Sequence, residues 1–293
     1  MTPQPLEVRL YENLAALESL RTEWEALLTE FPGATTFSTW EWLVPWWRAF
    51  GEGQQLKVLG FFDTTNRLVM LAPLSLTAHR APGGLKLNVL RMMGDGSQDS
   101  DNLDMPVRAG FEVGASRALI DWLAGHRREW DFCRLNTLPS DSPVGNQIIH
   151  EVKSRSWTCF TTTQPWLMVE LPESWESYLK TLSSNERSNI GRRTRRLEDN
   201  HRVRIYRCAS VTQLDSSLQA LFELHRKRWL SRGLPGSFES EARRQFYREL
   251  GELLIGRGLL HFWLLELDGR IVAAQFGFAC RLPKETENLA HLS

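Results

Sequence analysis

The chain has 293 residues, of which 42% are hydrophobic and 24% are charged, as in ordinary globular proteins. Its 35 lysines and arginines equal its 35 aspartates and glutamates, so no overall field favours nucleic acid or an anionic membrane. The four cysteines include no CxxC pair, which argues against a zinc site or a disulfide framework, and no apolar run could span a bilayer.

The first half predicts an α/β unit. It begins with a strand at 7–11, and Asn13 can cap the amphipathic helix that follows. Ser38 and Glu41 have the spacing of a capping box that would start a second, tryptophan-rich helix. The elements predicted after it are strands at 56–62, 68–76 and 85–93, a helix at 113–127, a strand at 132–135, a helix at 146–153, and strands near 157–161 and 166–171.

The second half predicts the same order of elements again. After a helix over 172–182, Ser183 and Glu186 form a capping box for a helix that ends near Asn200. The sequence VRIY at 203–206 nearly repeats VRLY at 8–11, and an amphipathic helix follows each copy. For the second of these helices, Ser210 and Gln213 have capping-box spacing, and a further helix is predicted at 239–255.

A hairpin is predicted around Asp268 and Gly269, because Asp-Gly favours a two-residue type I′ turn. Its arms, 259–267 and 270–278, are apolar at nearly every position, which predicts central strands covered on both faces. The repeated order predicts tandem α/β units at 1–171 and 172–293. No element is predicted after the second hairpin, so we expect the second unit to be truncated.

Short motifs follow one another in a characteristic order. They are FSTW at 37–40 with PWW at 45–47, LAPL at 71–74, MG at 93–94 before Asp99 and Asp101, LP at 171–172 with SW at 174–175, LH at 224–225 with RW at 228–229, and LDG at 267–269. In this order they resemble one branch of the GNAT acyltransferases, the CelD-type proteins of cellulose biosynthesis, which are related to the Fem aminoacyl transferases.

The resemblance implies tandem GNAT-like units, with mixed sheets flanked by helices. It also implies an acyltransferase that uses acetyl-CoA or another acyl-CoA and acts on a small molecule or saccharide in polysaccharide or cell-envelope biosynthesis. Independently of the resemblance, the scattered cysteines and an N-terminal sequence without a signal pattern predict a cytoplasmic protein. Family members continue past the hairpin into a cradle for the CoA pyrophosphate, which 281–293 does not resemble. The resemblance therefore leaves open both an active acyltransferase and a truncated, inactive one. The alternatives are a Fem-like aminoacyl transferase using charged tRNA and a non-catalytic partner in polysaccharide assembly.

Three residues are candidate acid–base groups. His225 lies on the apolar face of its predicted helix and could take a proton from an acceptor, although a core histidine bonded to a carbonyl is the plainer alternative. Glu266 lies on a predicted buried strand, where a carboxylate can have a raised pKa. Asp101 belongs to an acidic loop that could instead be a surface turn, and the loop lacks the spacing of an EF-hand metal site.

Binding residues are predicted in three other places. Eight arginines lie between 187 and 207, and three of them, together with Gln275, are candidates for holding the donor. The alternative is a solvated helix face. The candidate donor-binding arginines are Arg187, Arg192 and Arg195. Trp229, Trp40 and Asp99 are candidates for a substrate pocket, although most tryptophans here are predicted to fill the core.

Overall fold

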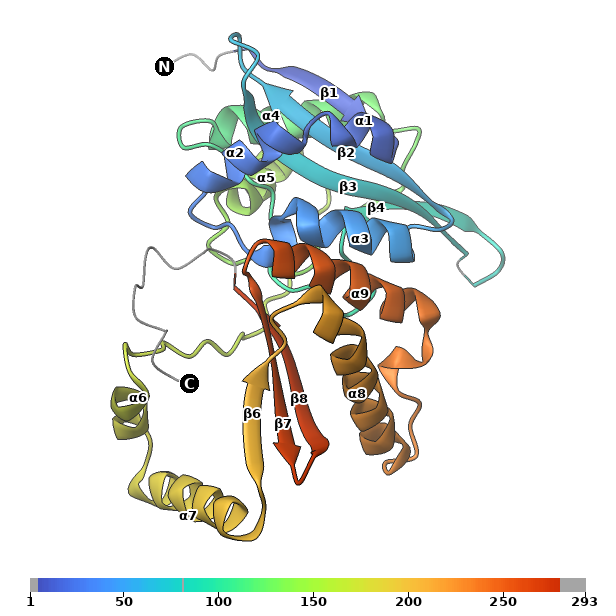
Figure 1. Cartoon of the computed structure of the whole chain (residues 1–293). Helices are drawn as coiled ribbons and strands as arrows, with labels where there is room; N and C mark the ends of the chain where they lie inside the picture. The colour runs from blue at the N-terminus through green and yellow to red at the C-terminus, as the bar shows by residue number, and fades with distance from the viewer. Residues whose placement is uncertain (1–4, 81, 280–293) are drawn as a thin grey trace. The chain divides into compact units, whose positions relative to one another are not determined.

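The structure is a computed structural model, and it describes residues 5–80 and 82–279 (Figure 1). The described chain forms two compact units. Unit 1 contains the residues up to Phe160 and a returning segment, Glu239–Leu259, followed by Ala279. Unit 2 contains Thr161–Phe238 and Leu260–Phe278. The chain therefore leaves unit 1, builds most of unit 2, and comes back.

Unit 1 is built on a five-stranded sheet in the order β1-β2-β3-β4-β5. The strands are β1 (Glu7–Tyr11), β2 (Gln54–Phe62), β3 (Leu68–Arg80), β4 (Lys86–Met92) and β5 (Phe132–Arg134). The first four pair antiparallel, whereas β5 runs parallel to β4. The predicted α/β class with a mixed sheet is therefore confirmed.

Helices accompany this sheet. They are α1 (Leu14–Glu18), α2 (Arg21–Glu30), the 3-10 turn η1 (Thr36–Ser38), α3 (Trp40–Phe50), α4 (Glu112–Gly125), α5 (Pro143–Ser154) and α9 (Glu241–Gly256). Asn13 caps α1 as predicted, because its side-chain oxygen accepts a hydrogen bond from the amide of Ala16 at 2.8 Å. Helix α2 packs on β3, and α4 packs on α5.

The tryptophans of unit 1 largely fill its core, as the sequence favours. Trp24, Trp42 and Trp46 are each at most 1% exposed. Their indole N–H groups donate to the Ser38 carbonyl, the Ser100 hydroxyl and the Ser97 hydroxyl at 2.8–2.9 Å. Each large ring is therefore buried without leaving its one polar group unsatisfied. Two of the three acceptors come from the loop that contains Asp99 and Asp101.

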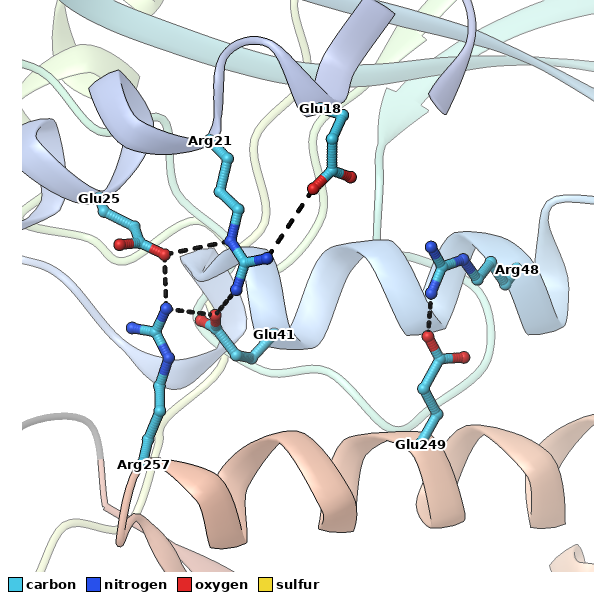
Figure 2. Close-up of polar contacts among 7 residues, drawn as sticks. All are labelled: Glu18, Arg21, Glu25, Glu41, Arg48, Glu249 and Arg257. Atoms are coloured by element: carbon cyan, nitrogen blue, oxygen red, sulfur yellow. Dashed lines mark hydrogen bonds and ion pairs between the residues drawn. The ribbon is translucent and has the colours of Figure 1, made fainter. Parts of the chain in front are cut away.

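Helix α9 packs antiparallel along α3, inside unit 1 (Figure 2). Phe246 is fully buried, with its ring edge-on to Trp42 at 5.2 Å and near Phe50 at 5.7 Å. At one end of the contact Arg48 is ion-paired with Glu249. At the other end Arg257 reaches Glu41 at 2.8 Å and Glu25 at 2.5 Å, and Arg21 joins the same cluster.

Unit 2 has a smaller sheet, in the order β6-β7-β8 with antiparallel pairing throughout. Its elements are α6 (Trp175–Thr181), α7 (Ser184–Asn200), β6 (Val203–Arg207), α8 (Val211–Leu230), β7 (Leu260–Leu267) and β8 (Arg270–Phe278), with the 3-10 turn η2 (Ser237–Glu239) where the chain leaves the unit. Asp268 and Gly269 have φ values of 52° and 82°, which confirms the predicted type I′ turn. Figure 1 shows α8 alongside this sheet, and its contacts are with β8.

The predicted repetition of element order is present. The strand β1 pairs with the first arm of the β2–β3 hairpin, and β6 pairs with the first arm of the β7–β8 hairpin. Each 3-10 turn precedes the helix that leads into the hairpin, which is α3 in one copy and α9 in the other. The predicted boundary between 171 and 172 concerns the repeated sequence and remains a prediction, whereas the contacts of α9 group it with unit 1.

Two predictions about strands are wrong. The stretches 157–161 and 166–171 contain no strand, and their apolar side chains are exposed, with Leu167 at 97% and Met168 at 90%. An apolar run suggests a strand, but a strand also needs a hydrogen-bonded neighbour, and the described chain supplies none here. The strand β8 is not covered on both faces either, because most of it is exposed or half-exposed and it is an edge strand among the described residues.

Two of the three predicted capping boxes are also wrong. Ser38 forms its box with Thr35, while the carboxylate of Glu41 is bound by Arg21 and Arg257. Gln213 accepts a hydrogen bond from the amide of Ala209 and none from Ser210. The third box is confirmed: the Ser183 hydroxyl and amide bind the Glu186 carboxylate and hold its pKa below the usual value.

Candidate functional site

His225 is brought into an aromatic cluster by the register of α8. Leu214, Leu218 and Phe222 form the buried stripe of this helix, and His225 continues it at a half-buried position. The imidazole is edge-on to Phe238 at 4.8 Å and lies 5.8 Å from the Trp229 ring. The two sequence-predicted residues of this helix therefore do lie together.

The backbone of Gly236 closes over the imidazole. A Cβ atom at this position would lie 3.1 Å from Nδ1 of His225, closer than side chains normally approach. A side chain at this position would therefore require the ring or the loop to shift slightly. Since an imidazole exchanges its proton near neutral pH, a ring held in this way could act as an acid or a base.

Glu266 and Gln275 do not meet. Glu266 is opposite Arg204 of β6, with 3.9 Å between its Oε2 and Nη1 of the arginine. Gln275 is opposite Trp263. Because side chains alternate along a strand, Glu266 lies on the face of Leu264, and Gln275 lies on the other face with Trp263. The hairpin therefore offers these two groups to different sides of the sheet.

The predicted donor-binding arginines of α7 are exposed and bonded only locally. Arg187 donates to the Leu182 carbonyl at 2.5 Å, Arg192 to Oδ1 of Asn189 at 2.6 Å, and Arg195 to the Gly191 carbonyl at 3.3 Å. Within the described ranges, none of the five α7 arginines forms an ion pair with a carboxylate. Their charges are therefore available to a ligand.

A hollow of about 630 Å³ lies near the end of α7. The residues that line it are Arg193, Arg196, Leu197, Asn200 and His201. His201 is fixed by Asp268, whose Oδ2 lies 2.7 Å from Nδ1 of the ring. The amide of Arg202 donates to the other oxygen at 2.8 Å, and these bonds hold the pKa of Asp268 below its usual value. The sequence did not single out this hollow, although the spacing of its arginines could have indicated a common helix face.

Asp99 and Trp40 are engaged within unit 1. Asp99 is bound by Arg243 of α9 at 3.1 Å and by the hydroxyl of Tyr247 at 3.2 Å, and burial together with Asp99 raises the pKa of Tyr247. Trp40 is 4% exposed, with its ring edge-on to Trp24 at 5.6 Å. These contacts explain both residues as part of the packing, and their predicted role in a substrate pocket stays a prediction.

The acidic loop holds one group that the sequence did not distinguish. Burial raises the pKa of Asp101, which is half-buried. Asp104 is only 3% exposed, and burial raises its pKa to about 6, although Ser142 and the Met105 amide both donate to its Oδ1. Ser142 also caps α5, so Asp104 is tied to the start of that helix.

The described residues contain no group of three or more His, Cys, Asp or Glu side chains arranged to hold a metal ion. Across the same residues, no helix combines the length and the apolarity that a bilayer crossing requires.

Residues 184–282 match a family model described as an acetyltransferase (GNAT) domain, Acetyltransf_6. The match begins at α7 and includes α8 with His225, and then both arms of the hairpin. Residues 184–282, which are less than half of the chain, therefore resemble a GNAT acetyltransferase domain. No curated protein sequence matches the chain. The CelD-type and Fem relationship goes beyond this match.

Solved structures offer only distant likenesses. An acetyltransferase from Trypanosoma brucei is 18% identical with a TM-score of 0.31, and it covers 57% of this chain and all of its own. An aminoglycoside antibiotic 6'-N-acetyltransferase from Acinetobacter baumannii is 13% identical with a TM-score of 0.30, and it covers 57% of this chain and all of its own. A Bacillus halodurans protein is 15% identical with a TM-score of 0.33, over 56% of this chain and 99% of its own.

Proposed function

We propose that this protein transfers an acyl group from acyl-CoA to an amine or a hydroxyl group. The observation that carries the proposal is the GNAT acetyltransferase match over 184–282. In this reaction the acceptor attacks the thioester carbonyl, the C–S bond breaks, CoA leaves as the thiol, and a base takes the acceptor's proton. The protein supplies position, a base and donors for the developing oxyanion.

We assign the base to His225. Its ring is half-buried among aromatic side chains, and Trp229 forms a wall beside it. Glu266 is the second candidate, and its carboxylate is paired with Arg204 of β6 at 3.9 Å. Asp101 is the third, and it belongs to unit 1 rather than to the matched segment.

The remaining predicted roles belong to the same proposal. Arg187, Arg192 and Arg195 would attract the anionic donor, with Gln275 on the hairpin as a further polar contact. Trp40 and Asp99 would need to leave their present contacts to reach a substrate, which makes them the weakest members of the set. The acceptor would be a small molecule or a saccharide of polysaccharide or cell-envelope biosynthesis, by resemblance to CelD-type proteins.

The exposed arginines of α7 also favour a second candidate function, aminoacyl transfer from charged tRNA. Five guanidinium groups lie on one helix, and the described chain offers them no carboxylate partner. Nucleic acid bound through such charges is released steeply as salt rises. Binding of charged tRNA that falls with salt, without binding of acetyl-CoA, would select this function, and binding of neither would favour a non-catalytic partner.

The full chain should be tested with acetyl-CoA against amine and saccharide acceptors while release of the CoA thiol is measured. His225→Gln should lower kcat by about 10²- to 10⁴-fold, because general base catalysis contributes that much. His150→Gln, at an exposed position of α5, is the control and should change nothing. Calorimetry that detects no heat with acetyl-CoA, in a chain shown to be folded, would reject acyl transfer.

A further inference from the structure

We infer that the hollow near the end of α7 is a binding site for a phosphate monoester, held by Arg193 and Arg196. These are neighbours on the helix surface, since they lie three residues apart, and Leu197 and Asn200 continue the same side. The predicted donor-binding residues Arg187, Arg192 and Arg195 are not part of the lining. Arg193 and Arg196 belong to the same arginine-rich helix, and the hollow singles them out from its other arginines.

Charge is the first argument. The lining contains two arginines and no carboxylate. Both arginines are exposed, and neither takes part in an ion pair anywhere in the chain from 5 to 80 and 82 to 279. Other arginines of the protein are neutralised internally, as Arg257 and Arg243 are. A guanidinium without an internal carboxylate presents its fork of N–H donors to an outside anion, and phosphate matches that geometry.

The second argument is that one wall of the hollow is held in place. The Asp268 carboxylate accepts from the amide of Arg202 and lies 2.7 Å from Nδ1 of His201. Since a carboxylate only accepts hydrogen bonds, Nδ1 carries the proton. Asn200 is held as well, because its Nδ2 donates to the Arg196 carbonyl at 2.7 Å. Two of the five lining residues therefore have an orientation fixed before any ligand arrives.

The size and composition of the hollow decide between ligand classes. A volume of about 630 Å³ lies in the range of small-molecule sites, which is roughly 300–1,000 Å³. Leu197 adds an apolar surface to the lining, suited to the organic part of a phosphate ester. A dianionic monoester can satisfy two guanidinium groups, whereas a carboxylate carries half that charge. The negative end of the α7 dipole disfavours an anion here, and the two arginine charges oppose that effect.

The site does not depend on acyl transfer. CoA carries a phosphate monoester on its ribose, so the donor of the proposed reaction is one possible source of the group. A nucleotide such as adenosine 3′,5′-bisphosphate carries the same group without the thioester. Binding of this probe can therefore be measured whether or not the protein transfers an acyl group.

The experiment is titration calorimetry on the full chain with adenosine 3′,5′-bisphosphate, CoA and dephospho-CoA, and with a short RNA oligonucleotide in a separate arm. The test variant is R193Q/R196Q, and its matched control is R226Q/R228Q, which removes the same charge from exposed positions of α8. Circular dichroism should show that both remain folded, since all four side chains are exposed.

Affinity for adenosine 3′,5′-bisphosphate should fall at least about tenfold in R193Q/R196Q, because each charge-assisted bond contributes that order of effect. It should fall clearly less in R226Q/R228Q, and CoA should bind more tightly than dephospho-CoA if CoA is the source. Equal losses in the two variants would mean a general charge effect and would overturn the site. The proposal would also be overturned if adenosine 3′,5′-bisphosphate did not bind, or if only the RNA bound.

Discussion

Helices α7 and α9 are both rich in arginine, and they differ completely in what surrounds them. Helix α9 buries Phe246, Leu250 and Leu254, and Arg243 is paired with a carboxylate of unit 1. Helix α7 buries no residue, and its arginines meet only their own helix or the residues just before it. The two helices are therefore similar in arginine content, but α9 is packed against unit 1 whereas α7 is exposed.

The difference follows from the apolar residues. Hydrophobic burial is what brings a helix to its partner, and the ion pairs then form because the partner's carboxylates are near. Helix α9 has large apolar residues at spacings that form one stripe, as Phe246, Leu250 and Leu254 do. Helix α7 has only Ile190 and Leu197, both half-buried. Whether a charged side chain forms an ion pair within the protein or faces solvent thus depends on the apolar residues on the same helix.

The largest expected effect comes from removing the apolar anchor of α9. Phe246→Ala should lower the free energy of unfolding of unit 1 by about 3–5 kcal/mol, because it leaves a cavity against Trp42 and Phe50. Ile190→Ala on α7 is the matched control and should cost less than about 1 kcal/mol, since little surface is buried there. Urea unfolding of both variants checks this, and similar losses would remove the distinction between the helices.

A second effect concerns the Asp104 carboxylate in unit 1, whose pKa is raised by burial. The pKa of Asp104 is raised to about 6 in the folded protein, from 3.8. The folded state therefore binds this proton more tightly, so stability falls as pH rises from about 4 to 6 and stays lower above that. The penalty at pH 7 amounts to about 1–3 kcal/mol.

Asp104→Asn should remove this pH dependence, because its oxygen can still accept from Ser142 and the Met105 amide. The measurement is the unfolding free energy of both proteins at several pH values between 4 and 7. The difference between them should change in favour of the variant as pH rises. A difference that does not vary with pH would show that Asp104 is already ionised without cost.

A third effect tests the ion pairs between α9 and the first helices. Arg257→Gln should cost about 1–2 kcal/mol, because Glu41 is 3% exposed and would keep only Arg21 as a cationic partner. Arg48→Gln should cost under about 1 kcal/mol, since the Arg48 side chain in that pair is half-exposed. Thermal unfolding in low and high salt would measure both, and a larger loss for Arg48 would contradict this order.

The smallest effect is expected on α7. R193Q/R196Q should change the free energy of unfolding by no more than about 0.5 kcal/mol, because both side chains are exposed and without ion pairs in the described chain. Urea titration without ligand is the measurement. A loss similar to that of Arg257→Gln would mean that α7 is held in the fold by its charges.

Local patterns in the sequence predicted much of the fold. The Asp268–Gly269 turn, the cap at Asn13, the box at Ser183 and the stripe of α8 all depend on residues a few positions apart. Such signals act within one turn or one hairpin, so the sequence contains all that they require.

Features that depend on distant residues could not be predicted in this way. The spacing from Ser38 predicts Glu41 as a capping residue, whereas its partner in the fold is Arg257, far along the chain. The sequence predicts Asp99 as a pocket residue, but Arg243 and Tyr247 bind it from α9. The same distinction applies to the candidate site. The spacing of one helix turn predicts that His225 lies beside Trp229. The strand register that places Glu266 and Gln275 on different faces cannot be read from the sequence.

The return of α9 to unit 1 has a consequence for synthesis on the ribosome. The chain emerges from its N-terminus, so Trp42 and Phe50 are made long before Phe246 arrives to cover them. During that interval the apolar side of α3 that carries these two rings is exposed to chaperones and to other nascent chains. Slowing translation between residues 160 and 239 would lengthen this exposure and lower the yield of native protein, even though no codon for unit 1 had changed.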